Sequence, residues 1–433
     1  MTQRWRPVIR LEVDYQDDGE PIWVGSLARD RDGAIYFRYA QSWRSRACEL
    51  SPLTLPAATT VQTVRAPSRS GGTGLHGVFG DSLPGQWGLA IQDRTFRRHG
   101  IPLDLVGALD RLAHLGQRTM GALTYRPSRP SRPVRGEASS LDVLVAHADG
   151  ALADSPAPET TSDDLLDALE RAAGTAGGAQ PKAVIAVNAR GSIRTVGSGK
   201  LPSGYRHYLV KFTPLRHGLG LRRESGLIEE VYARLARSAG IVVPPTRLLT
   251  TSDGRAHFAI ERFDRTAGGG RRHIHTLGGL LERGAADSTD YSEYFAVTRH
   301  LTRRHEEMAH VWRRLCFNLL ACNDDDHSHN IAFLLDPAAG WTLSPAYDLT
   351  FSPGRGDQRG MTIAGHARGT TRRIALDCAQ DGDLDRVSAE RIYDEVRAAL
   401  LTWPSVAEAA GVPAPTIVEI ESAMAQRRTA LEG

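Results

Sequence analysis

The chain has 433 residues, of which 41% are apolar and 24% are charged. These values are typical of a soluble globular protein and exclude an intrinsically disordered chain. With 53 basic against 50 acidic residues, the formal net charge is only +3, so the overall charge gives no indication of nucleic-acid binding. At roughly 150 residues per domain, the length predicts two to three domains.

The sequence predicts a cytoplasmic protein without a membrane partner. Charged residues recur every few positions in the first 19 residues, so no apolar signal segment is expected, and nowhere do 18 uncharged apolar residues follow one another. The four cysteines, Cys48, Cys316, Cys322 and Cys378, contain no CxxC pair, so neither a disulfide framework nor a zinc site is predicted.

Lysine is rare in this chain. Only three of the 53 basic residues are lysines, and all of them, Lys182, Lys200 and Lys211, lie within thirty residues. A lysine carries a compact charge that can point at one oxygen atom, whereas the guanidinium of arginine is broad and planar. We therefore expect this segment to contain a site that needs a point charge.

Residues 1–126 are predicted to form a β-rich domain. Strand-like runs on either side of residues 30–33 indicate a hairpin, and a helix is predicted over about 86–98. The run 126–137 is rich in Pro, Arg and Ser and shows no apolar periodicity, so we interpret it as a linker or exposed loop that marks the first domain boundary.

Residues 127–262 are predicted to form a second domain. A helix is expected to begin at Ser162 and end at Gly174, followed by a loop of small residues. A strand is predicted over 182–187, and a second strand returns after a turn at 188–191. Further strands are predicted over 205–214 and over 257–265. Between the last two, an amphipathic helix with Leu227, Val231 and Leu235 on one face should end at Gly240.

Residues 263–433 are predicted to be mainly helical. One helix carries Val311, Leu315 and Leu319 on a wide apolar face and runs into the acidic sequence "NDDDHSHN" at 323–330. A strand, a turn at 337–340 and a second strand follow, and then Asp348. The last fifty or so residues are again helical, and no internal repeat is visible.

The order of these features predicts phosphoryl transfer from ATP. Taken singly, the glycines indicate a tight turn, a strand lysine an exposed edge, three aspartates a surface turn, and Asp348 a cap. Together they supply each part that a kinase needs. The phosphate loop would contain Gly177, Gly178 and Lys182, the strand lysine would be Lys211, and its partner on the following helix would be Glu229. Asp325 and Asn330 would form the catalytic loop, followed later in the chain by Asp348.

Several kinase signatures are missing. The loop "GGAQPKA" is neither G-x-G-x-x-G nor a Walker A sequence, H-R-D is absent, and "PAYDL" replaces D-F-G. The predicted fold class is therefore α+β and protein-kinase-like without being a eukaryotic-type kinase. We expect two lobes, a β-rich N-lobe with an added N-terminal subdomain and a mainly helical C-lobe.

Nine short sequences, in order over about residues 20–350, resemble the HipA family of bacterial serine/threonine kinases, toxins of type II toxin–antitoxin systems. They are "VGSL", "FGDSLPGQWG", "GQRTMGALTYRP", "TAGGAQPK", "YLVKF", "AGIVVP", "ERFDR", "NDDDHSHN" and "SPAYDL". The resemblance implies a kinase that uses ATP and Mg²⁺ and transfers the γ-phosphoryl group to a protein hydroxyl.

The resemblance also implies roles for individual residues. Asp325 is the catalytic residue, with Asp324 and Asp326 supporting it, and Asn330 and Asp348 bind Mg²⁺. Where His329 stands, family members often carry lysine or arginine, so a fixed positive charge is not implied there. The expected ATP contacts are Gly177, Gly178, Ala179, Gln180, Pro181, Lys182, Lys211, the hinge residues Glu261, Arg262 and Phe263, and His327, His329, Asn330, Tyr347 and Asp348.

Regulation and partners follow from the same resemblance. Thr175 takes the place of the serine that the family autophosphorylates, and a phosphate there would push the loop out of its phosphate-binding form. The implied substrate is an aminoacyl-tRNA synthetase. The implied partner is a HipB-like helix-turn-helix antitoxin, which would bring the kinase to operator DNA.

Two other functions stay open at this point. A metal-dependent phosphoesterase would use Asp324, Asp325, Asp326, His327 and His329, but it would leave the glycine loop, Lys211 and Asp348 without a role. A nucleotide-binding corepressor would act through a DNA-binding antitoxin without significant kinase activity. Turnover of ATP separates the three, because only the kinase labels a protein.

Overall fold

A computed structural model describes residues 5–46, 48–64, 73–129, 140–152, 178–195, 201–215, 222–266, 269–354, 356 and 358–432. Thr175, Gly177 and the helix predicted from Ser162 to Gly174 lie outside the described residues. The chain divides into two compact units. The first contains Met1–Arg223, Leu249–His275 and Gly279–Glu282, and the second contains Glu224–Leu248, Thr276–Gly278 and Arg283–Gly433.

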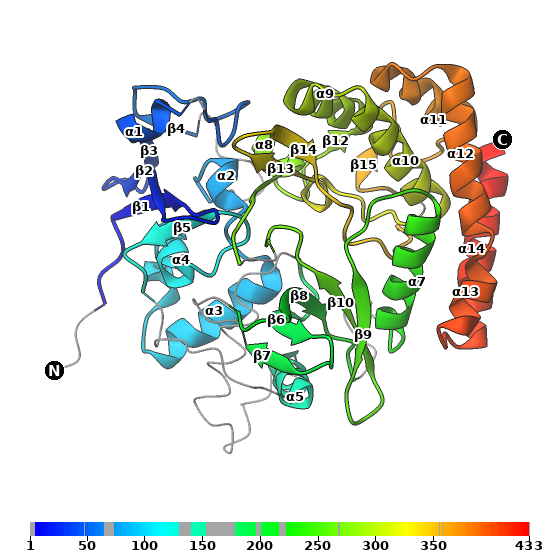
Figure 1. Ribbon diagram of the computed structural model, residues 1–433, viewed down its shortest axis with the longest axis horizontal. Coiled ribbons are helices and arrows are strands. Elements are labelled where there is room, and N and C mark those ends of the chain that lie inside the picture. The colour runs from blue at the N-terminus through cyan, green and yellow to red at the C-terminus, as the bar shows by residue number, and fades with distance from the viewer. Residues whose placement is uncertain are drawn as a thin grey trace. The chain divides into compact units, whose positions relative to one another are not determined.

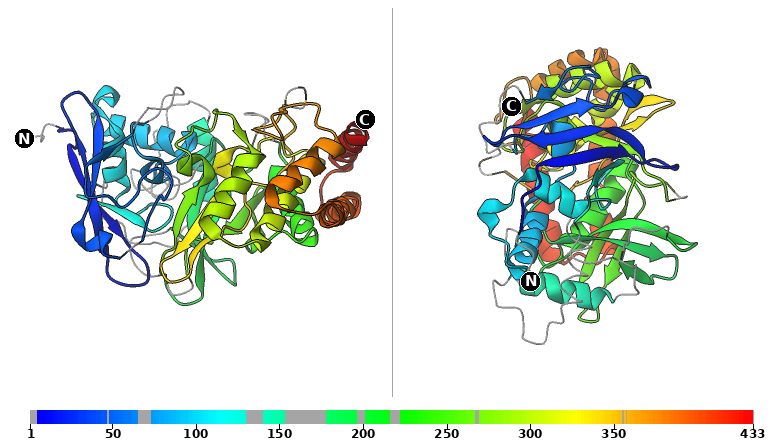
Figure 2. Two further views of the ribbon diagram at one scale, coloured as in Figure 1. Left: turned by 90° about the horizontal axis from the view of Figure 1, so that it is seen from above. Right: turned by 90° about the vertical axis from the view of Figure 1, so that its left-hand side faces the viewer.

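The first unit begins with a five-stranded sheet in the order β4-β3-β2-β1-β5 (Figures 1 and 2). The predicted hairpin is confirmed, because Asp30 accepts hydrogen bonds from the amides of Asp32 and Ala34 between two of these strands. The elements are β1 (Arg10–Tyr15), β2 (Ile22–Arg29), β3 (Ile35–Tyr39), β4 (Gln62–Thr63) and β5 (Leu123–Arg126), with α1 (Gln41–Arg44), α2 (Gly77–Gly80), η1 (Leu103–Leu105) and α4 (Ala108–Leu115).

A second sheet of this unit has the order β7-β6-β8-β10-β9. One of its faces packs on the helices α3 (Gln86–Arg98), predicted at these residues, and α5 (Leu141–Leu152), through Trp87, Ile91, Leu144, Ile185 and Val210. The strands are β6 (Lys182–Asn188), β7 (Ile193–Thr195), β8 (Tyr205–Lys211), β9 (Thr246–Thr250) and β10 (Ala256–Glu261); β11 (His273–Thr276) follows in the chain.

Two predicted strands end early. β8 stops at Lys211, shortly before Pro214, whose ring nitrogen cannot donate to a ladder. β10 stops at Glu261, because the next residues, Arg262 and Asp264, turn into a buried ion pair instead of continuing the sheet.

The second unit is mainly helical, as predicted, and α10 lies at its centre. α10 contacts α9, α12 and α14, while α7 contacts α12 and α13 (Figure 1). The helices are α7 (Ser225–Ser238), α9 (Tyr291–Thr302), α10 (Glu306–Leu320), α11 (Arg372–Cys378), α12 (Arg386–Leu400), α13 (Trp403–Ala409) and α14 (Ala414–Glu432), with η2 (Ser328–Asn330) and η4 (Ala379–Gly382). The short helix α8 (Leu277–Leu280) has its first two residues in the second unit and its last two in the first. β13 (Ala332–Asp336) and β14 (Gly340–Leu343) form the predicted hairpin, and β12 (Thr289–Asp290) pairs with β15 (Met361–Thr362).

The apolar face predicted for α10 is confirmed, since Val311, Leu315 and Leu319 are all buried. The face predicted for α7 is shifted, because Leu227 is half-buried while Ile228 is buried. Cys322 lies beyond the end of α10 at Leu320 and has a φ of 55°. No helix in the described part of the chain is long and apolar enough to cross a bilayer.

Candidate functional site

In the first unit, two of the three lysines lie side by side on one sheet face. Lys182 of β6 pairs directly with Lys211 of β8, and Lys211 pairs with Phe258 of β10. Side chains at directly paired positions share a face, and this face is opposite to the one that α3 and α5 cover. Both lysines are about 95% buried, at 4% and 5% exposure. Two ammonium groups in one place suit a ligand with several negative charges, such as a triphosphate.

The loop before Lys182 folds back on the lysine side chain. Gly178 has a φ of 85°, a backbone conformation that requires glycine, and a Cβ atom there would lie 2.7 Å from Lys182 Nζ and displace it. Trp87 of α3 holds the loop, because its amide donates to Gly178 O at 3.2 Å and its indole Nε1 donates to Lys182 O at 3.0 Å. The glycine backbone and the two lysines fit a phosphate-binding loop.

Trp87 is a residue that sequence reasoning missed. It belongs to "FGDSLPGQWG", which had been used for the family resemblance without a role in the site. Of the remaining loop residues, Ala179 is exposed and Pro181 is buried, with Pro181 O accepting from the Phe212 amide at 2.8 Å. Gln180 is half-buried.

The predicted hinge has an unexpected arrangement. The Arg262 side chain turns into the first unit, where Nε and Nη2 donate to Asp264 at 2.9 and 2.7 Å. Burial raises the pKa of the Asp264 carboxyl, but Arg262 and Arg265 outweigh it and hold that pKa well below its usual range. Asp264 also accepts from the Gly121 amide at 2.7 Å. The sequence "GQRTMG" is thus hydrogen-bonded through Gly121 to Asp264 of "ERFDR", whose carboxylate forms a buried ion pair with Arg262.

Glu261 and Phe263 are both half-buried, and Glu261 Oε1 accepts from Arg206 at 3.3 Å. Glu229, the predicted partner of Lys211, is a buried residue of α7. Lys211 belongs to the first unit and Glu229 to the second, and their pairing stays a prediction.

In the second unit, the three consecutive aspartates that follow α10 are not equivalent. Asp324 and Asp326 are both 3% exposed, whereas the side chain of Asp325 is 65% exposed. Two of the acids are thus turned inward and one outward. Asp325, the residue predicted to be catalytic, is therefore the accessible carboxylate of the three, and its role stays a prediction.

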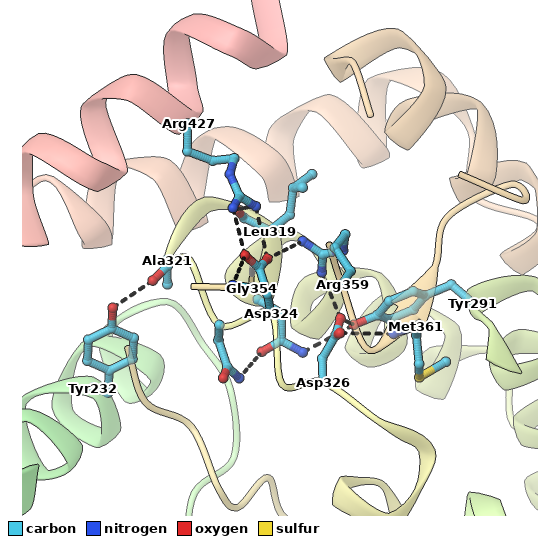
Figure 3. A network of polar contacts seen from close by, with 12 residues as sticks. Tyr232, Tyr291, Leu319, Ala321, Asp324, Asp326, Gly354, Arg359, Met361 and Arg427 are labelled. Atoms are coloured by element: carbon cyan, nitrogen blue, oxygen red, sulfur yellow. Dashed lines mark hydrogen bonds and ion pairs between the residues drawn. The ribbon is translucent and has the colours of Figure 1, made fainter. Parts of the chain in front are cut away.

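The two inward carboxylates form ion pairs with arginines (Figure 3). Arg359 contacts Asp324 at 3.2 Å and Asp326 at 2.7 Å, and Arg427 of α14 contacts Asp324 at 2.8 Å. Carboxylates with these partners and side-chain exposures of 0–1% are not available as metal ligands. This geometry excludes the phosphoesterase, which required Asp324 and Asp326.

Arg359, Arg427 and Tyr291 were not found from the sequence. Tyr291 donates from its hydroxyl to Asp326 Oδ2 at 2.8 Å and accepts from Asn318 Nδ2 at 3.1 Å. Burial, with Asp326 alongside, raises the pKa of the Tyr291 hydroxyl well above its ordinary value. Arg427 is 103 positions from Asp324, and no spacing in the sequence signals that contact.

Asn330 is tied to the residue it was predicted to assist. Its Nδ2 donates to the backbone oxygen of Asp325 at 2.9 Å, and its amide donates to His327 O at 2.8 Å. Because Nδ2 is used in this way, the side-chain oxygen Oδ1 of Asn330 is the atom of the carboxamide that can act as an acceptor. Oxygen is the ligand atom that Mg²⁺ prefers. His327 is half-buried, with Nε2 at 3.9 Å from Asp325 Oδ1.

His329 is held in the fold through both ring nitrogens. Nε2 lies 2.9 Å from Arg283 O and therefore carries the proton that it donates, while Nδ1 lies 3.3 Å from Thr276 Oγ1. A Cβ atom at Gly278 would come within 2.6 Å of Nε2. Tyr347 supports the same residue by donating from its hydroxyl to His329 O at 3.0 Å.

Asp348 has a φ of 59°, in the left-handed region that most L-residues avoid. Such conformations are costly and concentrate at functional sites. Asp348 is half-buried and follows the β13–β14 hairpin in the chain. The carboxylate of Asp348 and the amide oxygen of Asn330 are of the ligand type that Mg²⁺ prefers, and their role as Mg²⁺ ligands stays a prediction.

The first unit also contains a Ser–His–Asp arrangement. His275 Nδ1 lies 2.6 Å from Asp81 Oδ2, and Nε2 lies 2.9 Å from Ser51 Oγ. This spacing is that of a hydrolase triad. However, Ser51 and His275 are both 0% exposed, so no substrate reaches the hydroxyl. A Cβ atom at Gly279 would lie 2.5 Å from Asp81 Oδ2, which shows how closely the backbone packs on this cluster.

Comparison with known proteins identifies the family. Residues 174–403 match the model of the HipA-like C-terminal domain, and residues 19–126 match that of the HipA N-terminal domain. The first match alone covers more than half of the chain. The chain belongs to the HipA family. Among curated proteins, none matches the sequence.

Solved structures show that this HipA-family chain has the fold of a known HipA. The HipA of Shewanella oneidensis MR-1, solved with HipB and operator DNA, matches with a TM-score of 0.67 and 19% identity, over 98% of this chain and 96% of that chain. The Helicobacter pylori proinflammatory kinase CtkA matches with a TM-score of 0.39 and 15% identity, over 59% of this chain and 90% of that chain. The similarity to HipA confirms the predicted fold class.

Proposed function

We propose that this chain is a serine/threonine protein kinase that uses ATP and Mg²⁺ and serves as the toxin of a type II toxin–antitoxin system. The observation that carries the proposal is the exposure of Asp325 between two buried, ion-paired aspartates, together with the hydrogen bond of Asn330 to its backbone. A kinase needs one such carboxylate that can accept a hydroxyl proton, next to an amide that can hold a metal ion.

The remaining roles follow from the chemistry of each residue. Asp325 would orient the substrate hydroxyl and accept its proton while the oxygen attacks the γ-phosphorus and the bond to the β-phosphate oxygen breaks. Lys182 and Lys211 would bind phosphate oxygens, and the loop that begins at Gly178 would bring backbone N–H groups to them. Asn330 and Asp348 would hold Mg²⁺, which neutralises phosphate charge when bound.

Partners are proposed on family membership. The HipA of Shewanella oneidensis MR-1 is described in complex with HipB and its operator DNA. We infer that this chain binds a HipB-like helix-turn-helix antitoxin and reaches operator DNA through it. The proposed substrate is a protein of translation such as an aminoacyl-tRNA synthetase, and phosphorylated Thr175 would inactivate the kinase.

The proposal is tested by incubating the protein with γ-labelled ATP, Mg²⁺ and host lysate. Asp325→Asn should lower protein labelling by about 10²–10⁴-fold, because the amide cannot accept the hydroxyl proton. Since Asp325 is exposed, the free energy of unfolding should stay within about 0.5 kcal/mol of the wild type. The matched control is Asp336→Asn, another exposed aspartate of the second unit, which should label protein at the wild-type rate.

Equal labelling by wild type and Asp325→Asn would refute the assignment of the catalytic residue. If the wild type binds ATP but labels neither itself nor any lysate protein, the kinase proposal is wrong, and the chain is instead a nucleotide-binding corepressor.

A further inference from the structure

The residues before and after Asp325 are bridged by one arginine (Figure 3). Arg359 Nη1 donates to Asp324 Oδ1 at 3.2 Å, and Nη2 donates to Asp326 Oδ2 at 2.7 Å. The Arg359 side chain is only 2% exposed. Burial lowers the pKa of its guanidinium, but Asp326, Tyr291 and Asp324 outweigh burial, and the pKa is raised. Arg359 is therefore a fixed cation between the two acids.

A second arginine reaches Asp324 from the C-terminal helix. Arg427 of α14 donates from Nη1 to Asp324 Oδ1 at 3.0 Å and from Nη2 to Oδ2 at 2.8 Å. Two parallel bonds from one planar group fix both the position and the plane of the carboxylate. The same Nη1 lies 3.4 Å from Leu319 O, in the last turn of α10. Arg427 thus joins α14, the end of α10 and the catalytic loop.

Backbone groups complete the cluster. The amide of Gly354 donates to Asp324 Oδ2 at 3.0 Å, and the amide of Met361 donates to Asp326 Oδ1 at 3.1 Å. The amide of Gly360 donates to the backbone oxygen of Asp324 at 2.7 Å. Two carboxylates and two guanidiniums also balance in charge, which is what burial of four charged groups requires. The residues on both sides of Asp325 are held while Asp325 itself projects outward.

We propose that Arg359 and Arg427 are positioning residues that set the orientation of Asp325 by clamping Asp324 and Asp326, so that phosphoryl transfer depends on the C-terminal helix α14. This inference rests on the proposed kinase function. Arg427 lies beyond residue 403, where the match to the family model ends, so family membership does not assign it this role.

The clamp differs from an ordinary stabilising contact in what its loss should change. A catalytic carboxylate displaced by about 1 Å can cost on the order of 10²-fold in rate, even when substrate still binds. Loss of Arg427 should therefore lower kcat far more than it raises the KM for ATP, because the proposed phosphate-binding residues Lys182 and Lys211 belong to the other unit. Loss of fold stability alone would reduce the amount of active enzyme without changing kcat per folded molecule.

The experiment uses the full chain with Arg427→Ala, Arg427→Lys and Arg359→Lys. Each preparation is corrected for its folded fraction by thermal unfolding, and kcat and KM for ATP are measured by protein labelling. We expect Arg427→Ala to lower kcat by roughly 10- to 100-fold with KM changed less than about twofold. Arg427→Lys, which keeps the charge but loses the paired bonds, should give an intermediate kcat.

Arg313→Ala is the matched control. Arg313 is comparably buried, with 15% side-chain exposure against 10% for Arg427. It also ties helices of the second unit, through Ala239 O at 2.7 Å and Glu395 Oε2 at 2.8 Å. It should lower the unfolding temperature but leave kcat within about twofold of the wild type. Equal kcat values for Arg427→Ala and the wild type would overturn the proposal.

A second readout does not depend on activity. Hydrogen–deuterium exchange at the Gly354 amide, which donates to the Asp324 carboxylate that Arg427 holds, should become at least about tenfold faster in Arg427→Ala and not in Arg313→Ala. Unchanged exchange would refute the clamp itself. If the wild type transfers no phosphoryl group, the kinase proposal fails, and exchange still decides whether Arg427 holds the loop.

Discussion

At the residue scale, the site depends on differences between side chains that look alike in the sequence. Asp324, Asp325 and Asp326 are chemically identical, yet two bind buried arginines and the third is exposed. The lysines show the opposite effect, because Lys182 and Lys211 are 29 positions apart and yet directly paired in one sheet. Residues that are adjacent in the sequence, such as Asp324 and Asp325, thus have different surroundings, whereas Lys182 and Lys211, which are distant in the sequence, lie next to each other.

Gly178 offers a test of the phosphate loop. Gly178→Ala places a Cβ atom 2.7 Å from Lys182 Nζ in a backbone with positive φ, so the lysine must move. We expect the Kd for ATP, measured by fluorescence titration, to rise about tenfold, which corresponds to about 1.4 kcal/mol.

Gly191→Ala is the control for this change. Gly191 has a φ of 81° in the turn after β6, and a Cβ atom there meets nothing within 4 Å. Both variants carry the strain of about 1–2 kcal/mol that an alanine has in this conformation, but only Gly178→Ala should weaken binding. Equal ATP affinities of the two variants would show that Lys182 does not contact the phosphates.

At the scale of elements, α10 leads into the loop of Asp324, Asp325 and Asp326, and neighbouring helices contact α10 and its C-terminal end. The indole Nε1 of Trp312 donates to Ala389 O of α12 at 3.0 Å. The hydroxyl of Tyr232, on α7, donates to Ala321 O at 2.6 Å, directly after the last turn of α10. Ala321 precedes the three aspartates by only a few residues, so the end of the helix and the loop are positioned together.

Tyr232→Phe should therefore affect both stability and activity. Removing the hydroxyl leaves a buried carbonyl without this donor, at a cost of about 1–3 kcal/mol in the free energy of unfolding by urea. We also expect a drop in labelling rate per folded molecule, because Ala321 is released. Tyr39→Phe loses a comparable buried bond, to Leu55 O at 2.9 Å in the first unit, and should lower stability without changing that rate. A wild-type rate in Tyr232→Phe would contradict this view of the helix end.

At the scale of the whole molecule, the first unit contains the half-buried His207 and the buried His257 and His273, which the fold keeps neutral. Burial, with Arg262 nearby, lowers the pKa of His207 to about 3, and burial with Arg255 nearby lowers that of His257 to about 4. Burial also lowers the pKa of His273 to about 3, with His275 adding to the effect. An unfolded histidine has a pKa near 6.5, so below that pH the unfolded chain binds more protons than the folded one.

The free energy of unfolding should consequently fall as the pH drops from 6.5 toward 4, and it should be independent of these groups above 6.5. At pH 5 each histidine would cost about 2 kcal/mol at most. Urea unfolding between pH 5 and 8 measures the slope. His207→Gln should flatten it, whereas the exposed His300→Gln should not. A slope unchanged by His207→Gln would show that His207 binds a proton in the folded protein.

Much of the fold was predictable because it depends on local patterns. The apolar period of α10, the hairpin at Asp30 and the turn before β14 are each encoded within a few residues, and all three appear in the structure. The motif order was enough to indicate the family, which the matches to the two HipA domain models confirm. The roles of the site residues stay predictions that the proposed experiments test.

The sequence by itself determined the α+β class, the family and the choice of Asp325, since these depend on periodicity, motif order and residue chemistry. Only the tertiary structure decided which side chains support the site. Trp87 holds the loop before Lys182, and Arg359 and Arg427 hold Asp324 from 35 and 103 positions away. Local spacing in the sequence does not indicate such contacts, because nothing in the sequence distinguishes an arginine that forms a buried ion pair from the many arginines that are exposed to solvent.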